Sequence, residues 1–236
     1  MGTAVFWGGL GASALLLGAV AAYALRPGPR LVALVMALGS GLLIGSVSFE
    51  LIDDAVQNAE VAQVGLWALA GALVFTAGDW YLGRRGRRSG GSSDASSSLA
   101  IVFGAVLDGI PESFVLGLTV REGGVSVALL AAVVLSNLPE GVSSSTGLRA
   151  SGWSLGRVAA MWSVVVVVSA VASGAGYVVL DPSGGATGAA VQAFAAGALL
   201  AMVADTMLPE SFQEEGVFTG TLVVVGFSLA LVLSAL

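Results

Sequence analysis

The sequence contains no cysteine, no histidine and no lysine among its 236 residues. Without cysteine the chain can form neither disulfide bonds nor thiolate metal sites. Without histidine it lacks the commonest side-chain ligand of zinc, the usual proton shuttle and the base of a hydrolytic triad. Any cation site must therefore be built from oxygen atoms, and we expect the chain not to be an enzyme.

Charge is also scarce, because 10% of the residues are charged whereas 56% are hydrophobic. This is the composition of a membrane protein. Apolar segments of roughly 20 residues, long enough to cross a bilayer, predict an all-α polytopic fold of eight helices, at about 3–25, 31–54, 62–82, 98–120, 125–148, 158–180, 188–209 and 217–236. We expect one domain, residues 1–236, with the lipid bilayer as its partner and no nucleic acid. The first segment lacks the charged start of a cleaved signal and is kept as a helix.

All nine basic residues are arginines, and their distribution predicts the orientation. If the N-terminus lies outside, only Arg121 falls on the outer side. The positive-inside rule then places both termini outside the cell (inner) membrane. Residues 84–97, rich in arginine, glycine and serine, are predicted to form a cytoplasmic linker.

Two copies of one short phrase lie in the middle of long apolar segments. The first reads Leu-Asp-Gly-Ile-Pro-Glu and ends at Glu112, and the second reads Leu-Ser-Asn-Leu-Pro-Glu and ends at Glu140. Each places a polar residue, Asp108 or Ser136, four positions before the glutamate, so both side chains of a pair lie on one helix face. Such a pair can hold one ion, and the proline inside each helix frees a carbonyl oxygen one turn back.

Three carboxylates at matching depth on neighbouring antiparallel helices need a cation or protons, because an unpaired carboxylate at the bilayer centre costs a few kcal/mol. The predicted metal ligands are Asp108, Glu112, Ser136, Asn137 and Glu140. The alternative is a protonated cluster that only packs the helices together.

Acidic residues also mark two other helix ends. Glu50, Asp53 and Asp54 end the second predicted helix, while Asp205 and Glu210 end the seventh. One end points outward and the other inward, so the similarity suggests an inverted repeat of helices 1–3 and 6–8 around a central pair, a 3+2+3 arrangement. We expect these five residues to line an ion path, although a solvated helix end is an equal alternative for Glu50 and Asp54.

With these motifs the whole chain resembles the ZIP (Zrt/Irt-like) family of metal transporters. That family has eight helices, outer termini, a variable cytoplasmic loop and paired H-N-x-P-E-G motifs. Glu112, Asn137 and Glu140 match the motifs, while Asp108 and Ser136 stand where histidines are usual. The seventh helix resembles the family's D-E-I-I-P-E ending. The resemblance implies a metal site halfway across the membrane.

Departures from the family bear on the metal. Gly109 and Ser169 stand where a second site would have ligands, so one ion is expected. Oxygen donors suit Mn²⁺ or Fe²⁺, whereas the resemblance implies Zn²⁺. The expected function is transport of a divalent cation, zinc by default. The alternative is a non-transporting membrane scaffold or metal sensor, and assembly as a homodimer is left open.

Overall fold

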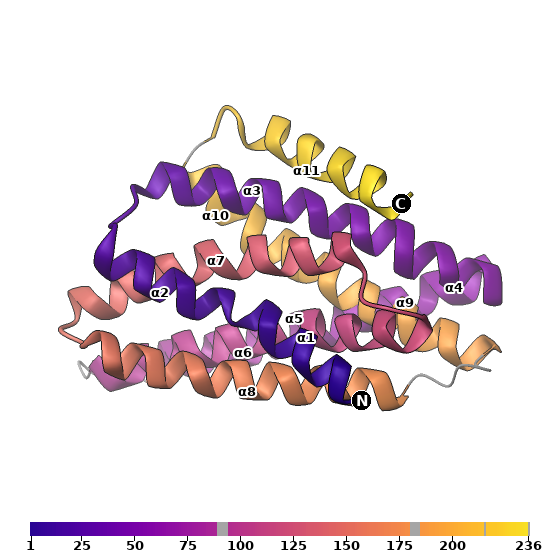
Figure 1. Cartoon of the computed structure of the whole chain (residues 1–236), viewed down its shortest axis with the longest axis horizontal. Helices are drawn as coiled ribbons and strands as arrows, with labels where there is room; N and C mark the ends of the chain where they lie inside the picture. The colour runs from indigo at the N-terminus through magenta and orange to yellow at the C-terminus, as the bar shows by residue number, and fades with distance from the viewer. Residues whose placement is uncertain (89–93, 180–184, 215, 236) are drawn as a thin grey trace.

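The computed structural model describes residues 1–88, 94–179, 185–214 and 216–235; within these ranges the side chains at 82–88, 94–105, 107 and 214 are not described. Every regular element in the described residues is helical (Figure 1). The elements are α1 (Gly2–Ala12), α2 (Ala14–Ala24), α3 (Pro29–Ser46), η1 (Val47–Ile52), α4 (Asp53–Asn58), α5 (Val61–Arg88), α6 (Asp94–Glu122), α7 (Val127–Ala150), α8 (Leu155–Val179), α9 (Gly185–Met202), η2 (Val203–Met207), α10 (Leu208–Glu214) and α11 (Thr219–Ser234).

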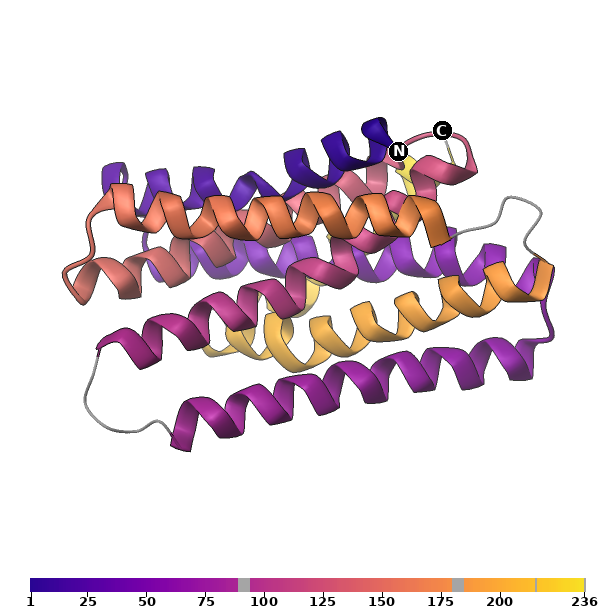
Figure 2. The same cartoon turned by 90° about the horizontal axis from the view of Figure 1, so that it is seen from below.

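Six helical segments among the described residues are long and apolar enough to cross a membrane. They are Gly2–Ala24, Pro29–Asn58, Val61–Tyr81, Val127–Ala150, Leu155–Val179 and Gly185–Gln213. Helix α11 is shorter, with 16 residues. The helices run roughly side by side along the long axis of the molecule (Figures 1 and 2). The chain is therefore an all-helical protein of the integral membrane class.

The observed helices differ in detail from the expected segments. The first is divided at Ser13 into α1 and α2. The second and seventh each contain a π-helical turn, η1 and η2, in which an extra residue widens the helix. Helix α5 continues to Arg88 and α6 begins at Asp94, so both ends of the predicted linker 84–97 are helical, and residues 89–93 lie outside the described part.

Glycines bring several pairs of helices into close contact. In the pair α5 and α9, a Cβ on Gly71 would meet the carbonyl group of Phe194, and one on Gly197 would meet that of Ala68. Reciprocal glycines of this kind also occur between α3 and α11, between α6 and α8 and between α2 and α7. Lipid gives no hydrophobic drive between helices, so close backbone approach and dispersion hold such pairs together.

This packing places the two proline-containing helices in the body of the bundle. Helix α6 packs along α8, while α7 packs against α2 and α3. The two chain ends lie toward the same end of the bundle (Figure 1). The motif residues on α6 and α7 are therefore held between other helices, away from both ends.

Candidate functional site

The two repeated phrases meet in the structure. Pro111 lies inside α6 and Pro139 inside α7, as predicted. Glu112 is 2% exposed and Ser136 is 5% exposed. The hydroxyl of Ser136 donates a hydrogen bond of 2.8 Å to Oε1 of Glu112, so it joins the two helices at the level of the motifs.

Glu112 is only partly satisfied by this contact. Its second oxygen, Oε2, is buried and has no hydrogen-bond partner among the described residues. Ser136 also lies 2.9 Å from the carbonyl oxygen of Val133, and one hydroxyl proton can serve only one of the two acceptors at a time. Buried polar atoms nearly always have partners, so an unpaired carboxylate oxygen is a position for a proton or a cation.

The other predicted ligands surround this pair less tightly. Asp108 and Glu140 are half-buried. Asn137 is buried, and its amide lies 3.5 Å from the carbonyl oxygen of Gly11 in α1. Within the described residues, no three Asp or Glu side chains are grouped closely enough to hold a metal ion. The ligand set predicted from the sequence is thus not assembled into a coordination shell in this conformation.

The carbonyl oxygen that Pro139 was expected to free for metal binding lies against a neighbouring helix. The carbonyl oxygen of Leu135, one turn before Pro139, lies 2.8 Å from the position that a Cβ on Gly39 would occupy. The backbone of α3 therefore packs directly against this oxygen. The carbonyl group at this position contributes to helix packing.

Glu50 lies toward the end of the bundle that holds the α6–α7 loop. It occupies the π-helical turn η1 and accepts a hydrogen bond of 2.6 Å from the hydroxyl of Ser126. Ser126 also caps α7, because its side-chain oxygen accepts a 3.0 Å hydrogen bond from the backbone N–H of Leu129. A cavity of about 480 Å³ opens beside Glu50, Ser126 and Glu122.

Asp54 belongs to the same acidic group, whereas Asp53 does not. The amide nitrogen of Gln192 donates a 2.6 Å hydrogen bond to Asp54 and also bonds to Glu122. Asp53 is exposed and accepts its 2.8 Å hydrogen bond from Gln57 on the same helix. Of the three predicted residues at this end, Glu50 lines the cavity, and Asp54 is connected to Glu122 in the cavity wall through Gln192.

Of the two remaining predicted residues, Glu210 lies toward the opposite end of the bundle, near Pro27 and Pro29 at the α2–α3 loop. Glu210 on α10 accepts a 2.8 Å hydrogen bond from Ser143 on α7, next to a cavity of about 150 Å³. Asp205, in the π-helical turn η2, is exposed and lies 3.4 Å from the hydroxyl of Thr76 on α5.

Several residues of these clusters were missed from the sequence. Gln192 had a readable signal, since it is the single amide side chain in α9, a helix whose only other polar side chain is Thr187, and it is 3% exposed. Glu122 follows Arg121 at a helix end and looks like an ordinary surface pair. Ser126 and Ser143 are common residues whose partners lie on other helices, so no sequence signal singles them out.

No protein-family model matches the chain, and no curated protein sequence matches it. Function is therefore argued from the geometry of these clusters.

Proposed function

We propose that the chain is a transporter that moves a divalent metal cation across the cell membrane through eight transmembrane helices arranged 3+2+3. The observation that carries the proposal is a row of three serines along α7, each donating a hydrogen bond to a glutamate on another helix. The pairs are Ser126 with Glu50, Ser136 with Glu112, and Ser143 with Glu210, at 2.6, 2.8 and 2.8 Å.

The row spans much of the bilayer. At 1.5 Å per residue, Ser136 lies roughly 15 Å along α7 from Ser126, and Ser143 lies roughly 10 Å further. Three acidic stations within a total of about 25 Å approach the hydrocarbon thickness of about 30 Å. A bundle that only packed in lipid would have no reason to keep glutamates on three elements at three successive depths, because a buried carboxyl group such as that of Glu112 carries a desolvation cost.

The central station would hold the ion most strongly. When a cation approaches, the Ser136 hydroxyl can turn from Glu112 to the Val133 carbonyl oxygen, 2.9 Å away, which leaves both carboxylate oxygens of Glu112 free. Glu140 and Asp108 belong to the same two motifs and are half-buried, and they would supply further carboxylates. Small movements of α6 against α7 would be needed to complete such a shell.

We take zinc as the cation because of the resemblance to the ZIP family, with Mn²⁺ or Fe²⁺ next because every donor is an oxygen. The proposed orientation has both termini outside. Arg149 lies in the last turn of α7, and Arg26 lies beside the α2–α3 loop, so both belong to the inner end; Arg121 ends α6 at the outer end. The positive-inside rule is the basis for naming these ends inner and outer.

The test is metal uptake by cells that express central-site variants. Glu112→Ala and Glu140→Ala should reduce accumulation of radiolabelled Zn²⁺ or Mn²⁺ to the level of empty-vector cells, because the central site loses a carboxylate. Glu60→Ala, which changes an exposed acid just before α5, is the matched control and should retain uptake. Wild-type uptake by both central variants at equal expression would refute the proposal.

A metal sensor or scaffold that does not transport is the second candidate. In such a chain the separate carboxylates seen in this conformation would bind an ion without passing it on. The purified chain would then bind metal, while expressing cells and reconstituted vesicles would show no uptake above background.

A further inference from the structure

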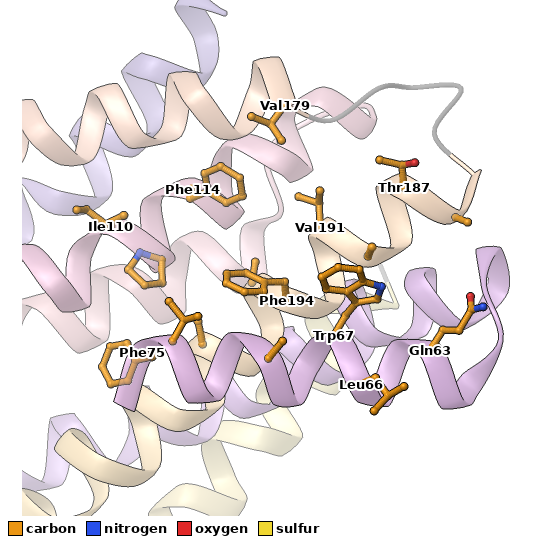
Figure 3. A pocket seen from close by; sticks show the side chains of 17 residues that line it. Gln63, Leu66, Trp67, Phe75, Ile110, Phe114, Val179, Thr187, Val191 and Phe194 are labelled. Carbon is orange, nitrogen blue, oxygen red and sulfur yellow. The ribbon is translucent and has the colours of Figure 1, made fainter. Parts of the chain in front are cut away.

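A large apolar groove opens on the side of the bundle, apart from the acidic clusters (Figure 3). Its volume is about 1080 Å³, and it lies between α5 and the pair α6 and α8, with α9 as its floor. Of its 17 lining residues, only Gln63 and Thr187 are polar. Both lie in the first turns of their helices, α5 and α9, so the groove has one polar mouth.

The groove runs from this mouth toward the middle of the membrane. On α5 its lining residues extend from Gln63 to Phe75, which corresponds to roughly 18 Å of helix. Its deep end is lined by Ile110 and Pro111, directly before Glu112. Trp67 on one wall is 49% exposed and Ile110 on the other is 41% exposed, so both walls face the surroundings of the bundle.

Helices α5 and α9 belong to segments that are long and apolar enough to cross a membrane, so we take the space beside the groove to be the hydrocarbon of the bilayer. Water in an apolar groove at that depth would lack hydrogen-bond partners. A second copy of the chain would have to insert a helix. A helix with its side chains is about 10 Å wide, which is wide for a groove formed between neighbouring helices of one bundle. A lipid acyl chain is much thinner and fits lengthwise.

The mouth favours a headgroup without net charge. Among the described residues no arginine lines the groove, and Glu60, an exposed acid, directly precedes α5. Gln63 and Thr187 offer neutral hydrogen-bonding side chains at this mouth. An anionic headgroup would face the Glu60 carboxylate, whereas phosphatidylethanolamine brings both a phosphate and an ammonium group.

We propose that this groove is a binding site for one zwitterionic membrane phospholipid, with its headgroup at Gln63 and Thr187 and one acyl chain lying between α5 and α6 as far as Pro111. The end of the acyl chain then packs beside the buried Glu112 and keeps water away from that side of α6. The site depends on the membrane location of the helices and not on metal transport, so either proposal can fail without the other.

The test uses the full-length chain, purified in mild detergent, delipidated and titrated with palmitoyl-oleoyl phosphatidylethanolamine under native mass spectrometry. One lipid should bind in preference to phosphatidylglycerol. Ala190→Phe, which places a ring on the groove floor, should weaken this binding by about tenfold, the loss expected when two CH₂ groups of the tail no longer pack there. Ala77→Phe, at an exposed alanine of α5 outside the groove, should leave binding unchanged. Equal affinity in all three proteins, or equal binding of phosphatidylglycerol, would overturn the proposal.

A second measurement does not depend on how a phenylalanine is tolerated. The chain has no cysteine, so Ala190→Cys creates a single thiol on the groove floor. Phosphatidylethanolamine should slow its reaction with a hydrophobic maleimide several-fold, and should not slow the reaction of an Ala77→Cys thiol. In membranes, a short bis-maleimide that joins two Ala190→Cys chains would show that a second copy fills the groove, and would overturn the lipid assignment.

Discussion

The contact between Ser136 and Glu112 gives a sharp prediction for the free energy of unfolding. Ser136→Ala removes the described hydrogen-bond donor of Glu112, whose other oxygen is already unpaired. Double-mutant cycles in a membrane protein average about 0.6 kcal/mol per hydrogen bond and reach about 1.7. Since a buried carboxyl group loses its hydroxyl donor, we expect a coupling near the upper limit, about 1.5 kcal/mol. In the Glu112→Leu background the same serine substitution should cost little, because no carboxyl group remains to be paired.

The measurement is denaturant unfolding in micelles, followed by the fluorescence of the five tryptophans, for the wild type, both single variants and the double variant. The control is Ser163→Ala, an exposed serine bonded at 2.8 Å to the Ala159 carbonyl oxygen of its own helix. Its substitution should show no coupling to Glu112→Leu. A Ser136–Glu112 coupling below about 0.3 kcal/mol, within the usual additivity error, would refute the contact between the two motif helices.

Two further predictions concern selectivity and packing. Asp108→His combined with Ser136→His replaces two oxygen donors by imidazoles, so the ratio of Zn²⁺ to Mn²⁺ taken up in competition should rise. An unchanged uptake ratio in a variant that still binds metal would mean that these positions do not line the site. Gly197→Leu places a side chain against the Ala68 carbonyl group and should lower the free energy of unfolding by about 1–3 kcal/mol in the same assay. Gly65→Leu, at a position with open space beside it, should be nearly neutral. Equal effects of the two substitutions would contradict the α5–α9 contact.

The helical segments could be predicted because twenty apolar residues have few alternatives in a membrane. The predicted segment 158–180 is observed as Leu155–Val179, for example. The π-helical turns could not be predicted. Residues Val47–Ile52 and Val203–Met207 contain no proline or glycine, so packing against neighbouring helices rather than local preference must determine the extra residue in each turn.

The candidate site could be predicted only where sequence motifs place residues of two neighbouring helices at the same depth. The repeated phrases placed Glu112 and Ser136 at the same depth, and the structure brings them into contact. The bridge that Gln192 makes to Asp54 depends instead on how α9 is rotated toward α4, which one sequence does not specify. For the same reason the carbonyl oxygen of Leu135 was expected to be available, whereas Gly39 covers it.

The serines of α7 show what kind of site a chain without histidine can build. A hydroxyl is both donor and acceptor, so Ser136 can donate to Glu112 in the absence of an ion or to the Val133 carbonyl oxygen when a cation takes the carboxylate. An arginine in that place could not turn away from the carboxylate without leaving its own charge unpaired, and would compete with the cation. A weak, neutral and reversible partner therefore keeps a buried glutamate tolerable while leaving it available, as the proposed passage of an ion would require, whereas a structural ion pair would keep the carboxylate occupied.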